Sequence, residues 1–502
     1  MRNDERKHAL ARIAGRFGDG QLNRRDFLSH CGNLGLGFSA AALLGLPGLR
    51  RTIGPSMAAA AEPTENAATK KWLREVGGGH RGAVIRMVSE NTPPSVVIAN
   101  LTRTVFTPLT GIDVQIELLP LDRVLKRVSI DAANRTAQYD LVYLDQSWIA
   151  LFGNDTVDPR EKFKANGELA MPAYDWDDFL PSLMKGIATY QGKTVGVPFD
   201  IPILMMFYRR DLFDELGLSV PTTMDEYMSV VRTIQKAKAP EIYGTTGQMK
   251  AGHYSLNCEW TAWLWGHGGS IFDAGGYFSG GDADGMQGLH YMLELYRNMP
   301  PYAATWDWNG QVESLLEGLA GVTLAWSEFF PAADNPKRSL VPGLLGAAPP
   351  PRATHLRPPE ECGFGEIPNV GHQGGSVLAL SKYSQQQNAA WIFLQWATSS
   401  EVQTMATLLG GGATPTRASV FEDPRVKKEA RVQAGTTRHF NAVRRTIETA
   451  MGSEPDFPAW PKISNGVIPR ELGRLLTHDD VSPETAMAAI KIEADKLAEP
   501  YR

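Results

Sequence analysis

Apolar and polar residues between positions 83 and 145 follow two different periods in turn. Some runs are short and β-rich or alternate strictly, which predicts strands, and the runs between them repeat apolar residues at helical spacing. In chain order they predict a strand at 83–88, a helix at 93–109, a strand at 112–118, a helix at 121–133 and a strand at 139–145. Strands that alternate with helices over short connections predict a parallel sheet.

Acidic and polar residues stand where the predicted strands end. Glu90 and Asn91 follow the first strand, Asp145 and Trp148 end or follow the third, and Asp200 ends a later apolar run. Ligands of open α/β sheets bind beyond the carboxyl ends of the strands. We therefore expect these residues at one edge, where each carboxylate can accept hydrogen bonds from two hydroxyl groups.

The same positions also have purely structural explanations. Asp145 and Asp200 could cap a following helix or lie on the surface. Asn91 and Thr92 are equally suited to cap a helix that begins near Pro93.

Two further patterns concern the middle of the chain. Thr222 or Thr223 can cap a helix whose first turn contains Asp225 and Glu226. Residues 340–370 are rich in proline and glycine and predict a long surface loop.

The N-terminal residues 1–61 resemble a twin-arginine export signal. Arg24 and Arg25 precede Phe-Leu, an uncharged stretch follows, and small residues at 58–61 suit cleavage. Cys31 precedes the apolar stretch, which argues against a lipoprotein anchor. We expect this segment to be removed and the mature chain to be periplasmic or otherwise extracytoplasmic.

Composition and charge narrow the function classes. The chain has 502 residues, 43% hydrophobic and 21% charged, which is typical of a soluble protein with two or three domains. Without the nine basic and four acidic residues of 1–61, 41 basic and 51 acidic residues remain, a net charge near −10. A nucleic-acid partner is not expected, because phosphate binding needs a basic surface.

Three cysteines give no metal-ligand spacing. No Cys-x-x-Cys or Cys/His pattern is present, so neither a metal site nor a cofactor is expected. Cys258 and Cys362 could be separate buried thiols or form one disulfide, and the sequence leaves both options open.

Four segments carry a family resemblance. They are 139–145, 196–223, 316–326 and 374–417, which include Gly-Val-Pro-Phe-Asp at 196–200, Ala-Gly-Val-Thr-Leu-Ala-Trp at 320–326 and Thr-Pro-Thr-Arg at 414–417. In order and spacing they resemble the extracellular solute-binding proteins of ABC importers, a class with maltodextrin-, disaccharide- and polyol-binding members.

The resemblance implies an α/β, two-lobed periplasmic-binding-protein fold, in which each lobe is a mainly parallel sheet flanked by helices and a hinge joins the lobes. It divides the chain into 62–200 (first part of lobe 1), 201–368 (first part of lobe 2), 369–418 (return to lobe 1) and 419–502 (lobe 2 and C-terminal helices). The ligand would bind in the cleft between the lobes.

The resemblance also adds site residues. Trp326 and Glu328 stand where family members commonly contact ligand, and Arg417 would bind ligand or seal the lobes. Aromatic faces suit the C–H surfaces of sugars, and glycine lets the backbone approach a ligand closely. The further candidates on these grounds are Trp260, Trp308, Gly374 and Gly375.

The predicted function is capture of a sugar, oligosaccharide or polyol by a monomer that delivers it, through hinge closure, to the membrane permease of an ABC importer. No enzyme activity is expected, and no Walker motif is present. Two alternatives remain open: an exported carbohydrate-active hydrolase with paired carboxylates, and a binder of polyamines or organic anions.

Overall fold

The computed structural model describes residues 66–409, 414–433 and 435–502. The predicted export signal, residues 1–61, lies outside the described residues. Within the described part of the chain, no helix is both long and apolar enough to cross a membrane.

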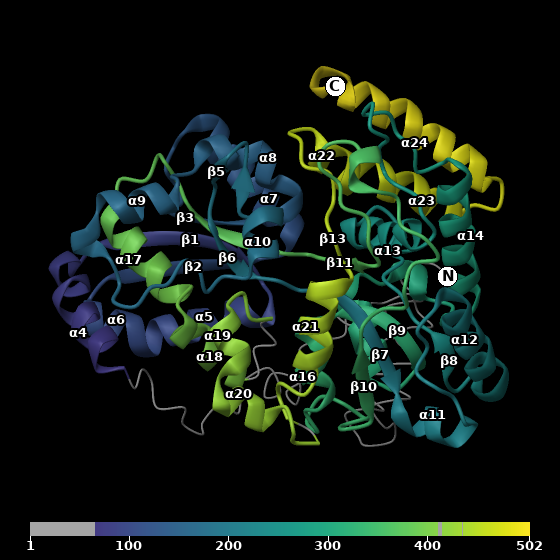
Figure 1. Ribbon diagram of the computed structural model, residues 1–502. Coiled ribbons are helices and arrows are strands. Elements are labelled where there is room, and N and C mark those ends of the chain that lie inside the picture. Colours follow the sequence, from purple (N-terminus) through teal and green to yellow (C-terminus); the bar gives the residue numbers. More distant parts are fainter. Residues whose placement is uncertain (1–65, 410–413, 434) are drawn as a thin grey trace, which may run out of the picture.

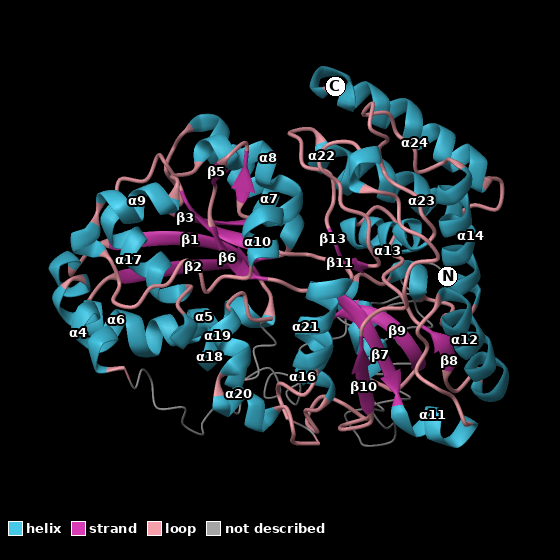
Figure 2. Cartoon of the chain, in the orientation of Figure 1, coloured by secondary structure: helices cyan, strands magenta, loops and turns pink. Residues whose placement is uncertain are grey.

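Two β-sheets with helices around them form two lobes, which lie side by side in Figures 1 and 2. The sheet of the first lobe has the strand order β2-β1-β3-β12-β6, and the sheet of the second lobe has the order β10-β7-β9-β8. The strands of the first are β1 (Val84–Glu90), β2 (Asp113–Leu119), β3 (Leu141–Asp145), β6 (Val197–Asp200) and β12 (Ser376–Leu380). Those of the second are β7 (Leu204–Arg209), β8 (Tyr243–Thr245), β9 (Ala320–Trp326) and β10 (Leu345–Ala348).

Strand direction is uniform in each sheet except for one strand. In the first lobe β1 is parallel to β2 and β3, whereas β12 is antiparallel to both β3 and β6. In the second lobe β8 is parallel to β9, whereas β7 is antiparallel to both β9 and β10. Both sheets are therefore mixed: all strands other than β7 and β12 share one direction within their sheet, but β7 and β12 are antiparallel to both of their neighbours.

The reversed strands are the ones through which the chain enters a lobe from the other. The chain leaves the first sheet at Asp200 and enters the second at Leu204, and it returns to the first sheet at Ser376. The two crossing segments are paired, because the Gly374 amide donates a 2.8 Å hydrogen bond to the Pro202 carbonyl, and Ile203 forms a β-bridge with Gln373. We call residues 201–203 and 373–375 the paired crossings.

Helices cover both sheets (Figure 2). Around the first they are α4 (Ala67–Glu75), α5 (Pro93–Leu101), α6 (Thr107–Thr110), α7 (Leu121–Asn134), α8 (Ile149–Phe152), α9 (Pro159–Ala165), α10 (Pro181–Gly186), α17 (Gln387–Ala397) and α18 (Ser400–Leu408). Around the second they are α11 (Arg210–Leu216), α12 (Met224–Lys238), α13 (Tyr254–Gly266), α14 (Ala283–Arg297), α15 (Trp308–Leu316), α16 (Phe330–Ala333), α21 (Phe440–Thr449), α22 (Trp460–Lys462), α23 (Ile468–Thr477) and α24 (Pro483–Ala498). Next to α18 lie α19 (Ala418–Glu422) and α20 (Pro424–Glu429). Two short strand pairs, β4 (Thr189–Tyr190) with β5 (Lys193–Thr194) and β11 (Gly371–His372) with β13 (Met451–Gly452), complete the fold.

The segment 340–370 differs from the predicted surface loop. It contains β10, which pairs with β7, and the fully buried Glu366, whose carboxyl accepts hydrogen bonds from the amides of Ile271 and Phe272. A strand of four residues between prolines and glycines leaves too short an apolar run to be recognised by its period.

Thr223 begins α12 with a capping box. Its hydroxyl accepts from the Glu226 amide at 3.2 Å, and the Glu226 carboxylate accepts from the Thr223 amide at 3.1 Å. The predicted cap is thereby confirmed. Both bonds satisfy backbone amides that have no partner within the helix.

We expect Thr223→Ala to lower the free energy of unfolding by about 0.5–2 kcal/mol, because it removes the acceptor for an N-terminal amide. Thr233→Ala is the matched control, since its hydroxyl only donates to the Ser229 carbonyl within the same helix. Chemical denaturation measures both, and equal losses in the two variants would contradict the capping role.

Candidate functional site

The strand ends of the two sheets meet between the lobes. Glu90, Asp145 and Asp200 are the last residues of β1, β3 and β6 in the first lobe, and Trp326 is the last residue of β9 in the second. The lobes touch at this level, where η3 (Gln146–Trp148) contacts α22 and η7 (Ser327–Phe329) contacts α5. Residues predicted at strand ends therefore come together at the interface between the lobes.

Four carboxyl groups form an acidic junction here: Glu90, Asp145 and Asp200 from the first lobe and Glu328 from the second. Burial, together with the nearby Asp145 and Asp200, raises the pKa of Glu90 to about 8. Burial also raises the pKa of Asp145 to about 7. Each carboxyl thus has a strong tendency to be protonated near neutral pH.

Asp200 and Glu328 form a carboxyl pair across the lobes. Burial raises the pKa of both groups, and the charge of Asp200 raises that of Glu328 well above its usual range. The side chains are close enough to hydrogen-bond, which requires a proton on one of them. Asp200 Oδ1 and Glu328 Oε2 are nevertheless buried without a hydrogen-bond partner in the described chain.

Asp145 both caps a helix and belongs to the acidic junction, which are the two roles considered for it from the sequence. Its Oδ1 accepts from the Ser147 amide at 2.9 Å and from the Ser147 hydroxyl at 2.6 Å, so it caps η3. Its carboxyl still belongs to the junction, because it raises the pKa of Glu90.

Hydrogen-bond donors lie around the acidic junction. Trp326 Nε1 donates to Gln248 Oε1 at 3.0 Å, and Gln373 Nε2 donates to Gln146 Oε1. The Nε2 atoms of Gln146 and Gln248 and the Nε1 atom of Trp148 are buried without an acceptor among the described residues. The site therefore presents buried donors as well as acceptors.

Gly374 and Gly375 let residues 373–375 of the paired crossings lie against the site. A Cβ on Gly374 would lie 3.0 Å from Trp326 Cζ3, and a Cβ on Gly375 would lie 2.6 Å from Gln373 Oε1. Larger residues at either position would displace the indole or the glutamine.

Two predicted residues lie elsewhere, which corrects our expectation. Trp260 is fully buried in the core of the second lobe, stacked on Phe278 with ring centroids 6.3 Å apart. Arg417 is also buried, and its guanidinium donates to the Thr398 and Asp175 carbonyls at 2.8 and 2.6 Å, within the first lobe. The sequence shows that both are large, but not whether they face a core or a cleft.

Two others lie beside the junction without joining it. Asn91 is exposed, and Thr92 rather than Asn91 caps α5, with its hydroxyl accepting from the Ser95 amide. Trp308 is partly buried at the start of α15, with its ring 4.7 Å from that of His253.

The sequence analysis did not identify Gln146 and Gln248. Gln146 directly follows Asp145, and Gln248 lies shortly after β8. The strand-end rule that selected Asn91 and the acids applies equally to Gln146 and Gln248.

A second buried network borders the junction around Glu454. Its carboxyl accepts from Tyr254, Asn257 and Trp460 at 2.6–2.8 Å, and His372 Nε2 lies 3.0 Å away. The possible metal-ligating atoms of Cys258, His372 and Glu454 lie within 4.8 Å of one another. However, burial raises the pKa of the Cys258 thiol and Glu454 already has four partners, so the chemistry favours a hydrogen-bonded anchor over a metal centre. Cys258 and Cys362 are both free thiols.

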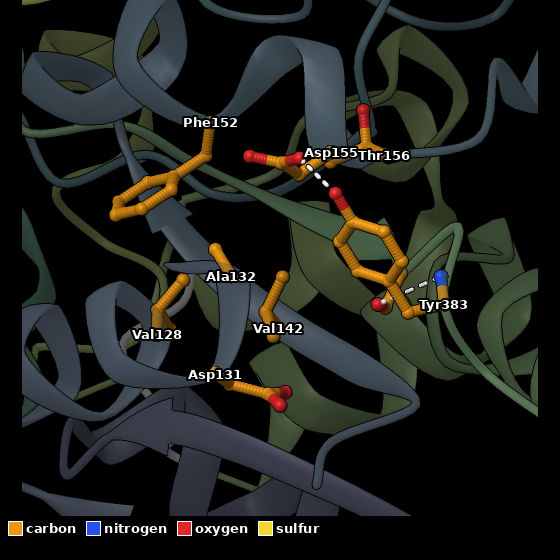
Figure 3. A pocket seen from close by; sticks show the side chains of 9 residues that line it. Val128, Asp131, Ala132, Val142, Phe152, Asp155, Thr156 and Tyr383 are labelled. Carbon is orange, nitrogen blue, oxygen red and sulfur yellow. Dashed lines mark hydrogen bonds between the residues drawn. The ribbon is translucent and has the colours of Figure 1, made fainter. Parts of the chain in front are cut away.

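A cavity in the first lobe is too small to be the site. Figure 3 shows it between α7, β3 and the Tyr383 ring, whose hydroxyl donates to Asp155 at 2.6 Å. Its volume of about 20 Å³ admits one water molecule.

Comparison with known proteins gives one family match. Residues 102–404 match the model of the bacterial extracellular solute-binding protein family. A probable amino-acid ABC transporter periplasmic-binding protein of Sinorhizobium fredii is 24% identical, over 70% of this chain and 76% of the relative. An erythritol/L-threitol-binding protein of Mycolicibacterium smegmatis is 22% identical, over 86% of this chain and 87% of the relative.

The solved structures include similar chains as well. An ABC transporter solute-binding protein from Agrobacterium radiobacter K84, in complex with ribitol, has a TM-score of 0.73 and 25% identity, covering 83% of this chain and 99% of that one. The two-lobed fold matches over nearly the whole of that structure.

We expect the stability of the ligand-free protein to fall as pH rises. In the folded protein the pKa values of Glu90 and Asp145 are about 8 and 7, above the ordinary values of 4.5 and 3.8. Their contribution is therefore complete below about pH 4 and is lost as pH rises towards 8. Glu90→Gln should flatten this decline by at most about 1.4 kcal/mol per pH unit.

Thermal melting from pH 4 to 9 measures this dependence. Glu422→Gln is the control, because that exposed carboxyl has its pKa lowered by Lys427 and Arg444 and its loss should not flatten the decline. If the melting temperature of Glu90→Gln fell with pH in parallel with that of the unmodified protein, the protonated state of the junction would be contradicted.

Proposed function

We propose, from the premise that this chain belongs to the bacterial extracellular solute-binding protein family, that it captures a polyol or a small sugar between its lobes for an ABC importer. The observation that carries the proposal is the acidic junction with its surrounding donors. A hydroxyl group both donates and accepts hydrogen bonds, so a polyhydroxyl ligand suits a buried site that offers both. The Trp326 indole adds a flat apolar face beside Gly374.

Ligand binding would act through lobe closure. Asp200 and Glu328 come from opposite lobes, and when they meet without a ligand they must retain a proton. A ligand that donates hydroxyl hydrogens to both carboxyls removes this requirement and bridges the lobes. Because it contacts both lobes only when they are closed, the ligand shifts the equilibrium towards the closed state.

The comparisons include binders of polyols and of sugars. One relative is named for erythritol and L-threitol, and one similar structure holds ribitol. A third relative is named for amino acids.

Several features of the transport cycle belong to the same proposal. The chain would leave the cytoplasm by the twin-arginine route through residues 1–61, act as a monomer, and dock its closed form on a membrane permease. We keep the predicted division into lobe segments 62–200, 201–368, 369–418 and 419–502, since the sheets exchange the chain at Asp200–Leu204 and near Ser376.

Hydrolysis is the alternative that the geometry disfavours. Retaining and inverting glycosidases hold their two carboxyls about 5 Å or more apart, on either side of the bond to be cleaved. Asp200 and Glu328 instead lie within hydrogen-bonding reach of each other. We therefore propose binding without turnover.

A thermal-shift screen across C4 to C6 polyols, hexoses and disaccharides tests the function. A polyol bound by the native state should raise the melting temperature. At a concentration 100 times its dissociation constant, it should add about 2.7 kcal/mol to the free energy of unfolding. Mass spectrometry should recover the ligand unchanged. Release of a shorter sugar, or no shift with any compound, would contradict the proposal.

We expect Trp326→Ala to weaken binding of the best polyol by about 10- to 100-fold, because truncation of a buried aromatic contact costs about 2 kcal/mol. Trp176→Ala is the matched control, since this partly buried indole packs against Phe163 inside the first lobe. Isothermal titration calorimetry compares the two variants. Unchanged affinity in Trp326→Ala would remove this residue from the site.

A further inference from the structure

The acidic junction contains no compensating cation. The charges that shift the pKa values of its four carboxyls are all those of other carboxyls, and among the described residues no lysine, arginine or histidine contributes. Among the described residues, the protein therefore offers no cation of its own to a junction carboxyl that loses its proton.

A second, independent observation points to a ligand. Gln248 is fully buried and Gln146 is 6% exposed, yet Gln248 Nε2 and Gln146 Nε2 have no partner among the described residues. A buried polar atom without a hydrogen-bond partner is destabilising, because it has lost its bonds to water without replacement. These atoms are linked to the junction, because Gln248 holds the Trp326 indole and Gln146 directly follows Asp145.

We propose, building on the function above, that the ligand is a polyhydroxyl compound that carries a protonated amine, such as an amino sugar, an amino alditol or an aminocyclitol. Its ammonium group would lie between Asp200, Glu328 and Glu90. Its hydroxyls would accept hydrogen bonds from the side-chain amides of Gln146 and Gln248.

The chemistry favours an ammonium over a further hydroxyl at the carboxyls. An ammonium group donates three hydrogen bonds, and charge-assisted bonds are about twice as strong as neutral ones. It also replaces the protons that otherwise keep the carboxyls neutral. A neutral polyol donates hydrogen bonds to the carboxyls, but these bonds are not charge-assisted. It also carries no positive charge to replace the carboxyl protons.

The exchange of protons for a cation makes the affinity depend on pH. The titratable groups that face the site are Glu90 on β1, Tyr143 and Asp145 on β3, Asp200 on β6, Glu328 on η7, Tyr254 and Cys258 on α13, His372 on β11, and Glu454. Burial and mutual repulsion raise the pKa values of the junction carboxyls. A cationic ligand should therefore bind more tightly as pH rises from 5 to 8, and release protons as it binds.

The test uses the mature protein and three matched series: glucitol, glucose and inositol, each with its monoamino derivative and the N-acetylated form of that derivative. Calorimetry at pH 8, in two buffers of different ionisation enthalpy, gives affinity and proton release together. We expect the best amine to bind at least about tenfold more tightly than its neutral parent, which corresponds to lowering one carboxyl pKa by one unit. The N-acetylated compound, without the charge, should lose this advantage.

Asp200→Asn separates charge from hydrogen bonding. The amide keeps the size of the side chain and one acceptor but removes the charge. We expect the ratio of amine to parent affinity to fall at least about threefold, while melting confirms that the variant is folded. An equal loss for amine and parent would show that Asp200 acts only as an acceptor, and would overturn the inference.

The outcomes separate the two proposals. If a neutral parent binds at least as tightly as its amine and no protons are released, the charged-ligand inference is wrong and the polyol-binding function stands. If none of the nine compounds binds, the charged-ligand inference is wrong, and the wider screen of C4 to C6 polyols, hexoses and disaccharides decides whether the polyol-binding function stands.

Discussion

Four carboxyl groups meet between the two lobes, three of them buried and Glu90 partly buried, and no cationic side chain among the described residues neutralises them; the rest of the arrangement depends on this constraint. Burial alone opposes a charged carboxylate, and the proximity of Asp145, Asp200 and Glu328 adds repulsion. The closed interface is therefore stable only when protons or a ligand occupy the carboxyl oxygens. Closure of the lobes without a ligand is therefore unfavourable at this interface, so ligand binding would be coupled to lobe closure.

Topology explains how the carboxyls meet. In each sheet the strands of common direction end at the interface between the lobes, and the reversed strands β7 and β12 begin there. Glu90, Asp145, Asp200 and Trp326 are consequently terminal residues of four strands from both sheets. Short loops after rigid strands hold polar side chains in place, as is usual for binding sites on α/β scaffolds.

Much of this could be predicted from local sequence. The alternating periods between residues 83 and 145 predicted the first three strands and their parallel order, and Thr223 was recognised as a cap. The strand β10 was missed because four residues between prolines and glycines have no measurable period. Trp260 and Arg417 were misplaced because a residue's type does not reveal the side of its element that is covered, and both pack inside a single lobe. The partners of Asp200 and Glu328 could not be predicted either, since more than 100 positions separate residues that only the folded lobes bring together.

The paired crossings have a mechanical consequence. Two chain segments tied by a backbone hydrogen bond and a β-bridge resist shear and twist far more than a single strand would, while bending about the line that joins them stays easy. Under the proposed hinge closure, motion of one lobe against the other would be confined to bending about this line. The same side chains of the two lobes would then face each other at every closure.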